Sequence, residues 1–375
     1  MDRFLLAYAA DADASAEQIG AQLLSQLCSV PATANLGFLY ITDTLAESAQ
    51  RILEHLRAST GVAHWVGSVG IGICCTGQEF YETPAAAVLI GTFPEDAFRV
   101  FTGVHDGLEG FVAQFSEWYQ AGQAHVAMVH GDPANQELPS LIEQLPEVMP
   151  GGFLVGGVTS SNTRNLQFDD RITEGGLSGV IFNEQVQIVT GLSQGCSPIG
   201  PKHVITACER NIISHIDNRP ALDVFYEDIG ELLARDLNRV AGYIFAGLPI
   251  AGSDKADYLV RNLVGVDSER KLLGIGDIVA PSQAIMFCRR DGASALEDLQ
   301  RMLADVQQRS GGRPARGAVY YSCLGRGRDL FGQHSEELQT IRSVLGDIPL
   351  VGFYANGEIC HNRLYGFTGV LSLFL

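Results

Sequence analysis

The sequence predicts an α/β (α+β) protein with two domains of repeated β-α-β-β units, in which helices pack on mixed sheets. Three observations lead to this prediction. A chain of 375 residues is long enough for two or three domains. Apolar residues make up 46% of it and aromatic residues 8%, which is enough to fill packed cores. One pattern of elements also occurs three times along the chain, which indicates an internal repeat.

The repeat consists of an apolar strand, an amphipathic helix, a strand that ends in Val-Gly, a variable turn and a final apolar strand. The copies comprise strand 36–41, helix 49–56, Trp65-Val66-Gly67 and strand 86–93; strand 126–129, helix 138–148, Leu154-Val155-Gly156 and strand 177–182; and strand 318–322, helix 338–345, Leu350-Val351-Gly352 and strand 367–374. The Val-Gly glycine precedes the closing phenylalanine by 26 residues in the first two copies and by 22 in the third. These near-equal spacings indicate duplication.

Local signals predict further elements. Residues 1–10 are mostly apolar, and we expect the first strand there. Capping-box spacings predict helix starts at Ser15 with Gln18, Thr44 with Glu47, Asp106 with Glu109, and Ser294 with Glu297. After Asp106, one helical face carries Leu108, Phe111, Val112, Phe115 and Tyr119, so we expect that face to lie in a core.

Two prolines and two glycines within residues 195–201 interrupt the strand pattern and predict a domain boundary. The N-terminal domain, residues 1–195, would hold two copies of the repeat. The C-terminal domain, residues 196–375, would hold the third copy, together with residues 217–290, in which no fourth copy is recognisable.

The charge of the chain excludes several classes of partner. Its 43 acidic and 25 basic residues give a formal net charge of −18, which repels nucleic acid and anionic membranes. No apolar run reaches the roughly 20 residues needed to cross a bilayer. The first residues lack a basic leader and soon reach Asp11 and Asp13. We therefore expect a cytoplasmic protein.

Eight cysteines are present without a C-x-x-C pair and without histidines at zinc-ligand spacing. We expect neither disulfides nor a structural zinc site, and we expect most of these thiols to be small buried side chains.

The usual catalytic signatures are missing, among them H-E-x-x-H, G-x-S-x-G and the phosphate-binding G-x-x-x-x-G-K-[ST]. Instead, the strand that ends at Cys323 leads into Gly325-Arg326-Gly327. Glycine frees backbone N–H groups and arginine can hold a carboxylate with two hydrogen bonds, so this loop predicts binding of a small carboxylate. The alternative is that Arg326 pairs with an internal acid such as Glu336, Glu337 or Glu358.

A second glycine turn, Gly352 to Glu358, supplies further candidates. We expect Tyr354 to pack on the ligand, and Asn356 and Glu358 to bind its polar or cationic end, because an acid opposite an arginine suits a zwitterion. Cys323 lies beside two arginines that would favour its thiolate, which makes it the best candidate for a reactive thiol. The alternative is a buried strand cysteine.

At these residues the chain resembles the FIST family, the sensory domains of bacterial signal-transduction proteins and of some F-box proteins. The resemblance rests on Ser322-Cys323 before Gly325-Arg326-Gly327, Glu336 and Glu337 in the next helix, Gly352-Phe353-Tyr354 through Gly357-Glu358, the junction 194–201 leading to 217–221, and Leu154-Val155-Gly156-Gly157. It covers nearly the whole chain.

The resemblance implies a non-enzymatic module that binds a small molecule such as an amino acid. Some members of the family are haem proteins that sense nitric oxide. His334 and His361 lie near the two glycine loops and are the candidates for an axial ligand of haem. No kinase, cyclase, methyl-accepting or F-box segment is recognisable in the chain. Output would then require a separate partner, such as a histidine kinase, a cyclase or a chemoreceptor. A ligand-free interaction scaffold is the third alternative.

Overall fold

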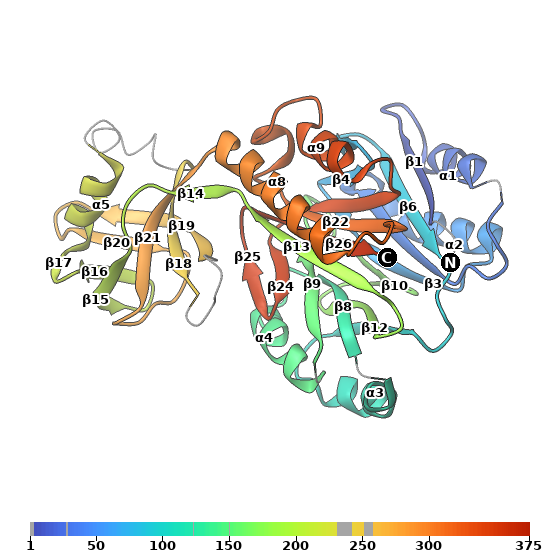
Figure 1. Cartoon of the computed structure of the whole chain (residues 1–375), viewed down its shortest axis with the longest axis horizontal. Helices are drawn as coiled ribbons and strands as arrows, with labels where there is room; N and C mark the ends of the chain where they lie inside the picture. Colours follow the sequence, from blue (N-terminus) through green and yellow to red (C-terminus); the bar gives the residue numbers. More distant parts are fainter. Residues whose placement is uncertain (1–3, 28, 123, 150, 231–241, 251–257) are drawn as a thin grey trace. The chain divides into compact units, whose positions relative to one another are not determined.

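The computed structural model of the protein describes residues 4–27, 29–122, 124–149, 151–230, 242–250 and 258–375 (Figure 1). The chain forms two compact units, Met1–Ser193 with Leu296–Leu375, and Gln194–Ala295. The mixed α/β class is as predicted. The division expected after residue 195 falls at the first crossing between the units, but residues 296–375 return to the first unit instead of continuing the second.

The first unit contains three copies of one arrangement. The first copy comprises β1 (Leu5–Ala10), α1 (Ala16–Gln26), β2 (Leu36–Thr42), α2 (Ala49–Thr60), β3 (His64–Gly70), β4 (Gly72–Cys75), β5 (Gln78–Tyr81) and β6 (Ala85–Gly91). The second comprises β7 (Phe98–Val104), α3 (Glu109–Gly122), β8 (Ala124–Gly131), α4 (Leu138–Val148), β9 (Phe153–Val158), β10 (Gln167–Asp169), β11 (Ile172–Thr173) and β12 (Leu177–Asn183). The third comprises β13 (Ile188–Gln194), α8 (Gly292–Arg309), β22 (Gly317–Cys323), α9 (Glu336–Leu345), β23 (Leu350–Ala355), β24 (Glu358–His361), β25 (Arg363–Tyr365) and β26 (Thr368–Phe374).

The strand pairing confirms the predicted repeat. In each copy the second strand runs parallel to the third and antiparallel to the last, as β2 does with β3 and β6, β8 with β9 and β12, and β22 with β23 and β26. The repeat is longer than predicted, because each copy begins with a further strand and helix and carries a hairpin before its last strand.

These hairpins are exchanged between copies. The β4–β5 hairpin of the first copy pairs with β23 of the third, β10–β11 of the second pairs with β3 of the first, and β24–β25 of the third pairs with β9 of the second. Each of the three six-stranded sheets therefore combines four strands of one copy with a hairpin of another.

The repeated Val-Gly glycine is required by close approach of the parallel strands. A Cβ atom at Gly67, Gly156 or Gly352 would lie 1.8, 2.0 or 1.7 Å from a carbonyl oxygen of the neighbouring strand. The three oxygens belong to Leu39, Val129 and Tyr320. Only glycine leaves room for this backbone contact.

Each sheet of the first unit has two buried faces. One face is covered by the helices of its own copy, with clusters that include Leu23 and Ile52, Phe111 and Leu141, and Leu303 and Ile341. The opposite faces pack on one another, and the rings of Phe93, Phe182 and Phe374 meet there at centroid distances of 5.3 to 5.8 Å. The predicted core face of α3 is confirmed for Leu108, Phe111 and Phe115, and Val112 is half-buried against the same cluster. The side chain of Tyr119 lies outside the described residues.

Helix starts agree in part with the capping signals. Ser15 and Gln18 form a complete capping box at α1. Residues 43–48 form a 3₁₀ turn, and α2 follows it from Ala49. At α8 the carboxylate of Asp291 accepts hydrogen bonds from the backbone of Ala293 and from the hydroxyl of Ser294, so Asp291 performs the capping predicted for Ser294.

The second unit is inserted between the first strand and first helix of the third copy. It comprises β14 (Cys196–Pro198), β15 (His203–Glu209), β16 (Ile212–Ile216), β17 (Arg219–Pro220), α5 (Ala221–Ile229), β18 (Ile244–Pro249), β19 (Tyr258–Asp267), β20 (Leu272–Ile275) and β21 (Ala284–Arg290). Strands β21, β15, β16, β20, β19 and β18 pair in this order, and a β18–β21 pairing closes the ring. All pairings between described strands of this unit are antiparallel, so it is not a further copy of the repeat.

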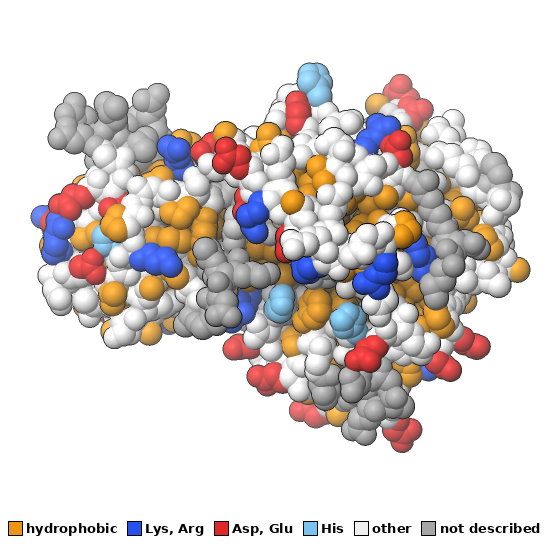
Figure 2. All heavy atoms as spheres, in the orientation of Figure 1, with side chains coloured by type: hydrophobic (Ala, Val, Ile, Leu, Met, Phe, Trp, Pro, Cys, Tyr) orange, Lys and Arg blue, Asp and Glu red, His pale blue; other side chains and the backbone are white. Residues whose placement is uncertain are grey.

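On the face that Figure 2 shows, acidic side chains are present on both units. None of the seven cysteines among the described residues forms a disulfide with another of them, and all but Cys208 are buried, which agrees with the prediction of small buried thiols. Within the part of the chain that the structure describes, no helix has the length and apolar character needed to span a membrane.

Candidate functional site

The loop after β22 has the tight glycine geometry that the sequence predicts. Gly327 has a φ of 51°, and a Cβ atom there would lie 2.1 Å from the hydroxyl of Tyr81 and 2.7 Å from the ring of Tyr354. The 3₁₀ turn Gly327–Asp329 follows, and the chain then reaches α9. The glycine therefore allows the loop to lie against the β4–β5 hairpin.

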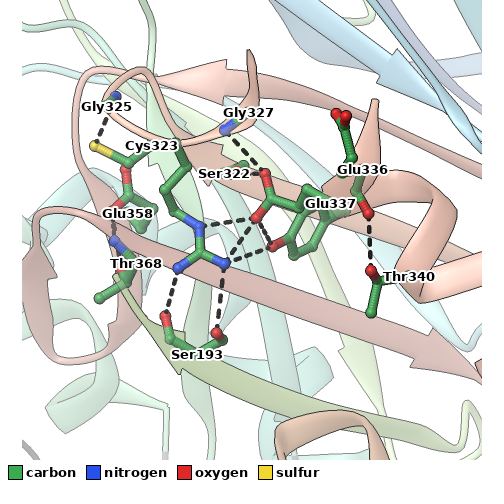
Figure 3. Close-up of polar contacts among 12 residues, drawn as sticks. Ser193, Ser322, Cys323, Gly325, Gly327, Glu336, Glu337, Thr340, Glu358 and Thr368 are labelled. Carbon is green, nitrogen blue, oxygen red and sulfur yellow. Dashed lines mark hydrogen bonds and ion pairs between the residues drawn. The ribbon is translucent and has the colours of Figure 1, made fainter. Parts of the chain in front are cut away.

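Arg326 belongs to this loop and is fully buried. Figure 3 shows the residues that contact it, among them Glu337 and Ser193. Its Nε and Nη2 lie 2.8 and 2.7 Å from Oε1 of Glu337, which is also fully buried. Longer hydrogen bonds of 3.4 Å connect the guanidinium to the carbonyl and hydroxyl oxygens of Ser193. The guanidinium carbon lies 4.9 Å from the ring centre of Phe331.

Glu337 is held by several further donors. Its carboxylate accepts hydrogen bonds from the hydroxyl of Tyr320 at 2.6 Å, the hydroxyl of Ser322 at 3.0 Å and the backbone N–H of Gly327 at 3.1 Å. The loop thus has the predicted chemistry, a guanidinium and a glycine N–H around a carboxylate, but the carboxylate belongs to the same chain. Of the two alternatives for Arg326, the structure shows the internal ion pair.

The charge of Arg326 is secured by its partner. Burial would lower the pKa of the guanidinium, but the negative charge of Glu337 outweighs burial and raises it. A buried ion pair of this kind is costly to break from one side, because the remaining charge has no counter-ion. Arg326 and Glu337 therefore brace the loop against α9.

Tyr354 is buried beside this ion pair. Its hydroxyl donates a hydrogen bond to Glu79, and its ring centre lies 4.8 Å from that of Tyr81. Burial raises the pKa of Glu79 to about 7. Asn356, two residues after Tyr354, has an exposed side chain, and its backbone N–H donates to the carbonyl of Val158.

Glu358 lies on the other side of the loop and is fully buried. Its Oε2 accepts hydrogen bonds from the backbone N–H and the hydroxyl of Thr368 at 2.9 and 2.8 Å, whereas Oε1 has no partner within hydrogen-bond geometry. The neighbouring Cys323 thiol also interacts with this carboxyl and lowers its pKa, but less than burial raises it. Burial raises the pKa of this carboxyl to about 8. The sequence predicted Glu358 as a binding residue, but it did not indicate that the carboxyl would be buried.

Cys323 is buried next to Glu358, and the prediction of an activated thiolate is wrong. Burial, with a further contribution from the charge of Glu358, raises the pKa of the thiol. The nearby Arg326 is paired with Glu337. The Sγ atom lies 3.5 Å from the backbone nitrogen of Gly325, which donates to it. The alternative, a buried strand cysteine, is the one observed.

Comparison with known proteins settles the family. The FIST N domain matches residues 35–219 and the FIST C domain matches residues 221–361. The chain belongs to the FIST family. Membership indicates a role in sensory signal transduction. The two FIST domains meet within the inserted second unit, so their division along the sequence does not coincide with the two compact units.

Curated relatives match this chain over nearly their full length. Uncharacterized protein MT0656 of Mycobacterium tuberculosis (strain CDC 1551 / Oshkosh) is 31% identical over 358 residues, which cover 92% of each chain. Uncharacterized protein Mb0898c of Mycobacterium bovis is 29% identical over 353 residues, 91% of this chain and 89% of the relative. A crystal structure of a chorismatase aligns with a TM-score of 0.35 and 9% identity over the full length of both chains, a likeness too weak to carry an argument.

The two histidines predicted for a haem-binding FIST protein are exposed. The backbone N–H of His334 donates to the carboxylate of Glu336. His361 stacks on Phe153, with ring centres 5.0 Å apart and planes inclined by 19°. Haem binding through either of them stays a prediction.

Several residues around the FIST loops were not found from the sequence. Ser193 comes from β13, and Glu79 comes from the exchanged β4–β5 hairpin. Thr368 begins β26 and follows a turn in which Phe367 has a positive φ. Gly77 marks the turn of the hairpin that carries Glu79, and it is a local sequence signal for that hairpin. No local pattern indicates that the hairpin pairs with β23.

Proposed function

We propose that this FIST protein is a non-enzymatic sensor of a small molecule, an amino acid or a similar small carboxylate that also carries an amino group. Its family supports the sensory role. The observation that carries the choice of ligand is the free Oε1 of Glu358, a buried acceptor at the end of the glycine loops. A ligand amino group would donate to this oxygen, and the exposed Asn356 would lie at the edge of the site.

The energetics of Glu358 favour a ligand with an amino group. A buried polar atom without a partner costs about 1–3 kcal/mol, which a hydrogen bond from the ligand would recover. Because the pKa of Glu358 is about 8, this carboxyl is mostly protonated at neutral pH. An ammonium group would favour the ionised form, so binding would release a proton and affinity would rise with pH up to about 8.

Arg326 has a supporting role in this proposal. It is saturated by Glu337 and Ser193, so it shapes the loop and leaves ligand binding to neighbouring groups. The high pKa of Cys323 disfavours its thiolate and supports a role without covalent catalysis. The signal would pass to a separate partner, such as a histidine kinase, a cyclase or a chemoreceptor.

Native mass spectrometry of protein purified without added ligand, followed by calorimetry with a panel of amino acids, tests the proposal. Glu358→Gln keeps the size of the side chain but removes its ionisable group, and should abolish the rise of affinity with pH. Glu17→Gln, at an exposed position of the same unit, is the matched control. Unchanged affinity and pH dependence in Glu358→Gln would remove Glu358 from the site.

The same spectrum tests haem as the alternative. A haem protein would show the mass of haem and a Soret band that is lost in His334→Ala or His361→Ala. A bare chain that also fails to respond to the amino-acid panel would favour the interaction scaffold instead.

A further inference from the structure

Three equivalent residues of the repeat meet where the inner faces of the three sheets pack together. They are Tyr40 on β2, His130 on β8 and Tyr321 on β22. In each copy, the residue just before it supplies the carbonyl oxygen that faces the Val-Gly glycine. All are fully buried. Their ring centres lie 5.6 to 6.5 Å apart, and the ring of Phe353 packs against all three.

Hydrogen bonds within this cluster leave one nitrogen atom unused. The hydroxyl of Tyr40 lies 3.0 Å from Nε2 of His130 and 3.5 Å from the hydroxyl of Tyr321. Nδ1 of His130 is buried without a partner. If Tyr40 donates to Nε2, then Nδ1 carries a proton and needs an acceptor; if Nε2 donates to Tyr40, then Nδ1 needs a donor. Either tautomer leaves Nδ1 unsatisfied.

A second polar group without a hydrogen-bond partner lies opposite His130 on the neighbouring strand. Ser178 on β12 is the antiparallel partner of His130, so the two side chains share one face with Cβ atoms about 4.5–5.5 Å apart. The Ser178 hydroxyl is also buried without a partner. The residues equivalent to Ser178, Ala87 opposite Tyr40 and Val370 opposite Tyr321, are apolar. Of the three equivalent pairs, only this one has a polar side chain on both strands.

We propose that a small uncharged molecule, able both to donate and to accept a hydrogen bond, is bound between Nδ1 of His130 and the hydroxyl of Ser178. Water is the smallest such molecule, and a small organic alcohol or amide has the same chemistry. One bound molecule satisfies both orphaned groups, and because a hydroxyl can donate or accept, it suits either tautomer of His130.

The electrostatics of the cluster select an uncharged occupant. Burial lowers the pKa of His130 to about 3, so the ring is neutral at physiological pH. Burial also raises the pKa values of Tyr40 and Tyr321, which keeps both phenols protonated. The cluster therefore offers dipoles without a counter-ion for a charged group. This site is distinct from Glu358 and does not depend on the proposed function.

A crystal structure of the purified protein at a resolution that shows ordered water, combined with native mass spectrometry, provides the first test. We expect electron density within hydrogen-bond distance of both His130 Nδ1 and Ser178 Oγ. Single-atom density without a mass adduct identifies water, and larger density with an adduct identifies an organic molecule. Either result supports the site, whereas absence of density between these atoms overturns it.

Nitrogen NMR of protein labelled with ¹⁵N in histidine tests the same contact in solution. Ser178→Ala removes one of the two anchors, so we expect the Nδ1 resonance of His130 to shift and the melting temperature to fall. Ser372→Ala is the matched control, because Ser372 is also buried without a partner but lies opposite Val319. It should leave the His130 resonance in place. Equal resonances in wild type and Ser178→Ala would contradict the bridge.

Discussion

The buried ion pair between Arg326 and Glu337 gives the most direct test of the structure. Arg326→Met removes the cation and leaves the carboxylate of Glu337 buried, while Glu337→Gln removes the anion and leaves the guanidinium buried. Both side chains are inaccessible to solvent, so water cannot replace the lost partner. Breaking such a pair from one side costs about 3–5 kcal/mol of unfolding free energy.

The double variant separates the ion pair from its surroundings. Glu337→Gln retains an oxygen that can accept from Tyr320, Ser322 or Gly327, which all bond to the wild-type carboxylate. With both charges removed, no buried ion remains unpaired. We therefore expect the double variant to be destabilised by less than the sum of the two single changes, with a coupling of about 1–3 kcal/mol, the range for residues in one network.

Urea unfolding followed by tryptophan fluorescence measures this effect in the relevant unit. The two tryptophans of the chain, Trp65 and Trp118, both belong to the first unit, so their emission reports on the unit that holds the ion pair. Arg342→Met, which removes an exposed ion pair with Asp347, is the control and should change stability far less. Single variants that lose less than about 1 kcal/mol, or additive effects in the double variant, would refute the burial described here.

Three further predictions follow from other sites. Gly352→Ala should destabilise the fold severely, because its Cβ would lie 1.7 Å from the carbonyl oxygen of Tyr320. The control is Gly110→Ala in α3, whose Cβ meets no atom within 4 Å and which should stabilise the protein by about 0.4–1 kcal/mol. Equal melting temperatures of the two variants would contradict the close approach at Gly352. Burial raises the pKa of Glu358 in the folded protein to about 8 from an ordinary value of 4.5, so the free energy of unfolding falls as pH rises between these two values. Glu358→Gln should remove up to about 1.4 kcal/mol of this fall per pH unit. Parallel pH–stability curves of wild type and variant would contradict the raised pKa. Iodoacetamide should label the half-buried Cys208 faster than Cys323 in the native protein, as peptide mass mapping can show, and faster labelling of Cys323 would mean that its thiol is accessible.

Much of the fold was predictable because the repeat imposes a visible spacing. Gly67, Gly156 and Gly352 mark the same backbone contact in all three copies, and this requirement is strong enough to survive in the sequence. The exchange of hairpins was not predictable. A hairpin such as β4–β5 has the same local pattern whichever strand it joins, and only the packed structure determines its partner.

The candidate site shows a similar limit. The loop sequence correctly indicated a guanidinium holding a carboxylate, and Glu337 was among the acids considered. Sequence could not decide between an internal and an external carboxylate, because the decision depends on the burial of Arg326. The cluster of Tyr40, His130 and Tyr321 was missed for a different reason. Its members become equivalent only after the strand register is known.

The exchanged hairpins make the three copies mutually dependent for folding. Deleting the second copy would remove the strands that follow β3 in the first sheet and would also leave β24 without β9. Strands β3 and β24 would then lose their partner strands at the same time. Their exposed, unpaired backbone groups would promote aggregation. The first unit is thus a closed ring of three interlocked parts that is complete only when the last strands of the chain have been synthesised. During translation, the first sheet can be completed once the second copy has been made, whereas the other two sheets must wait for the third copy.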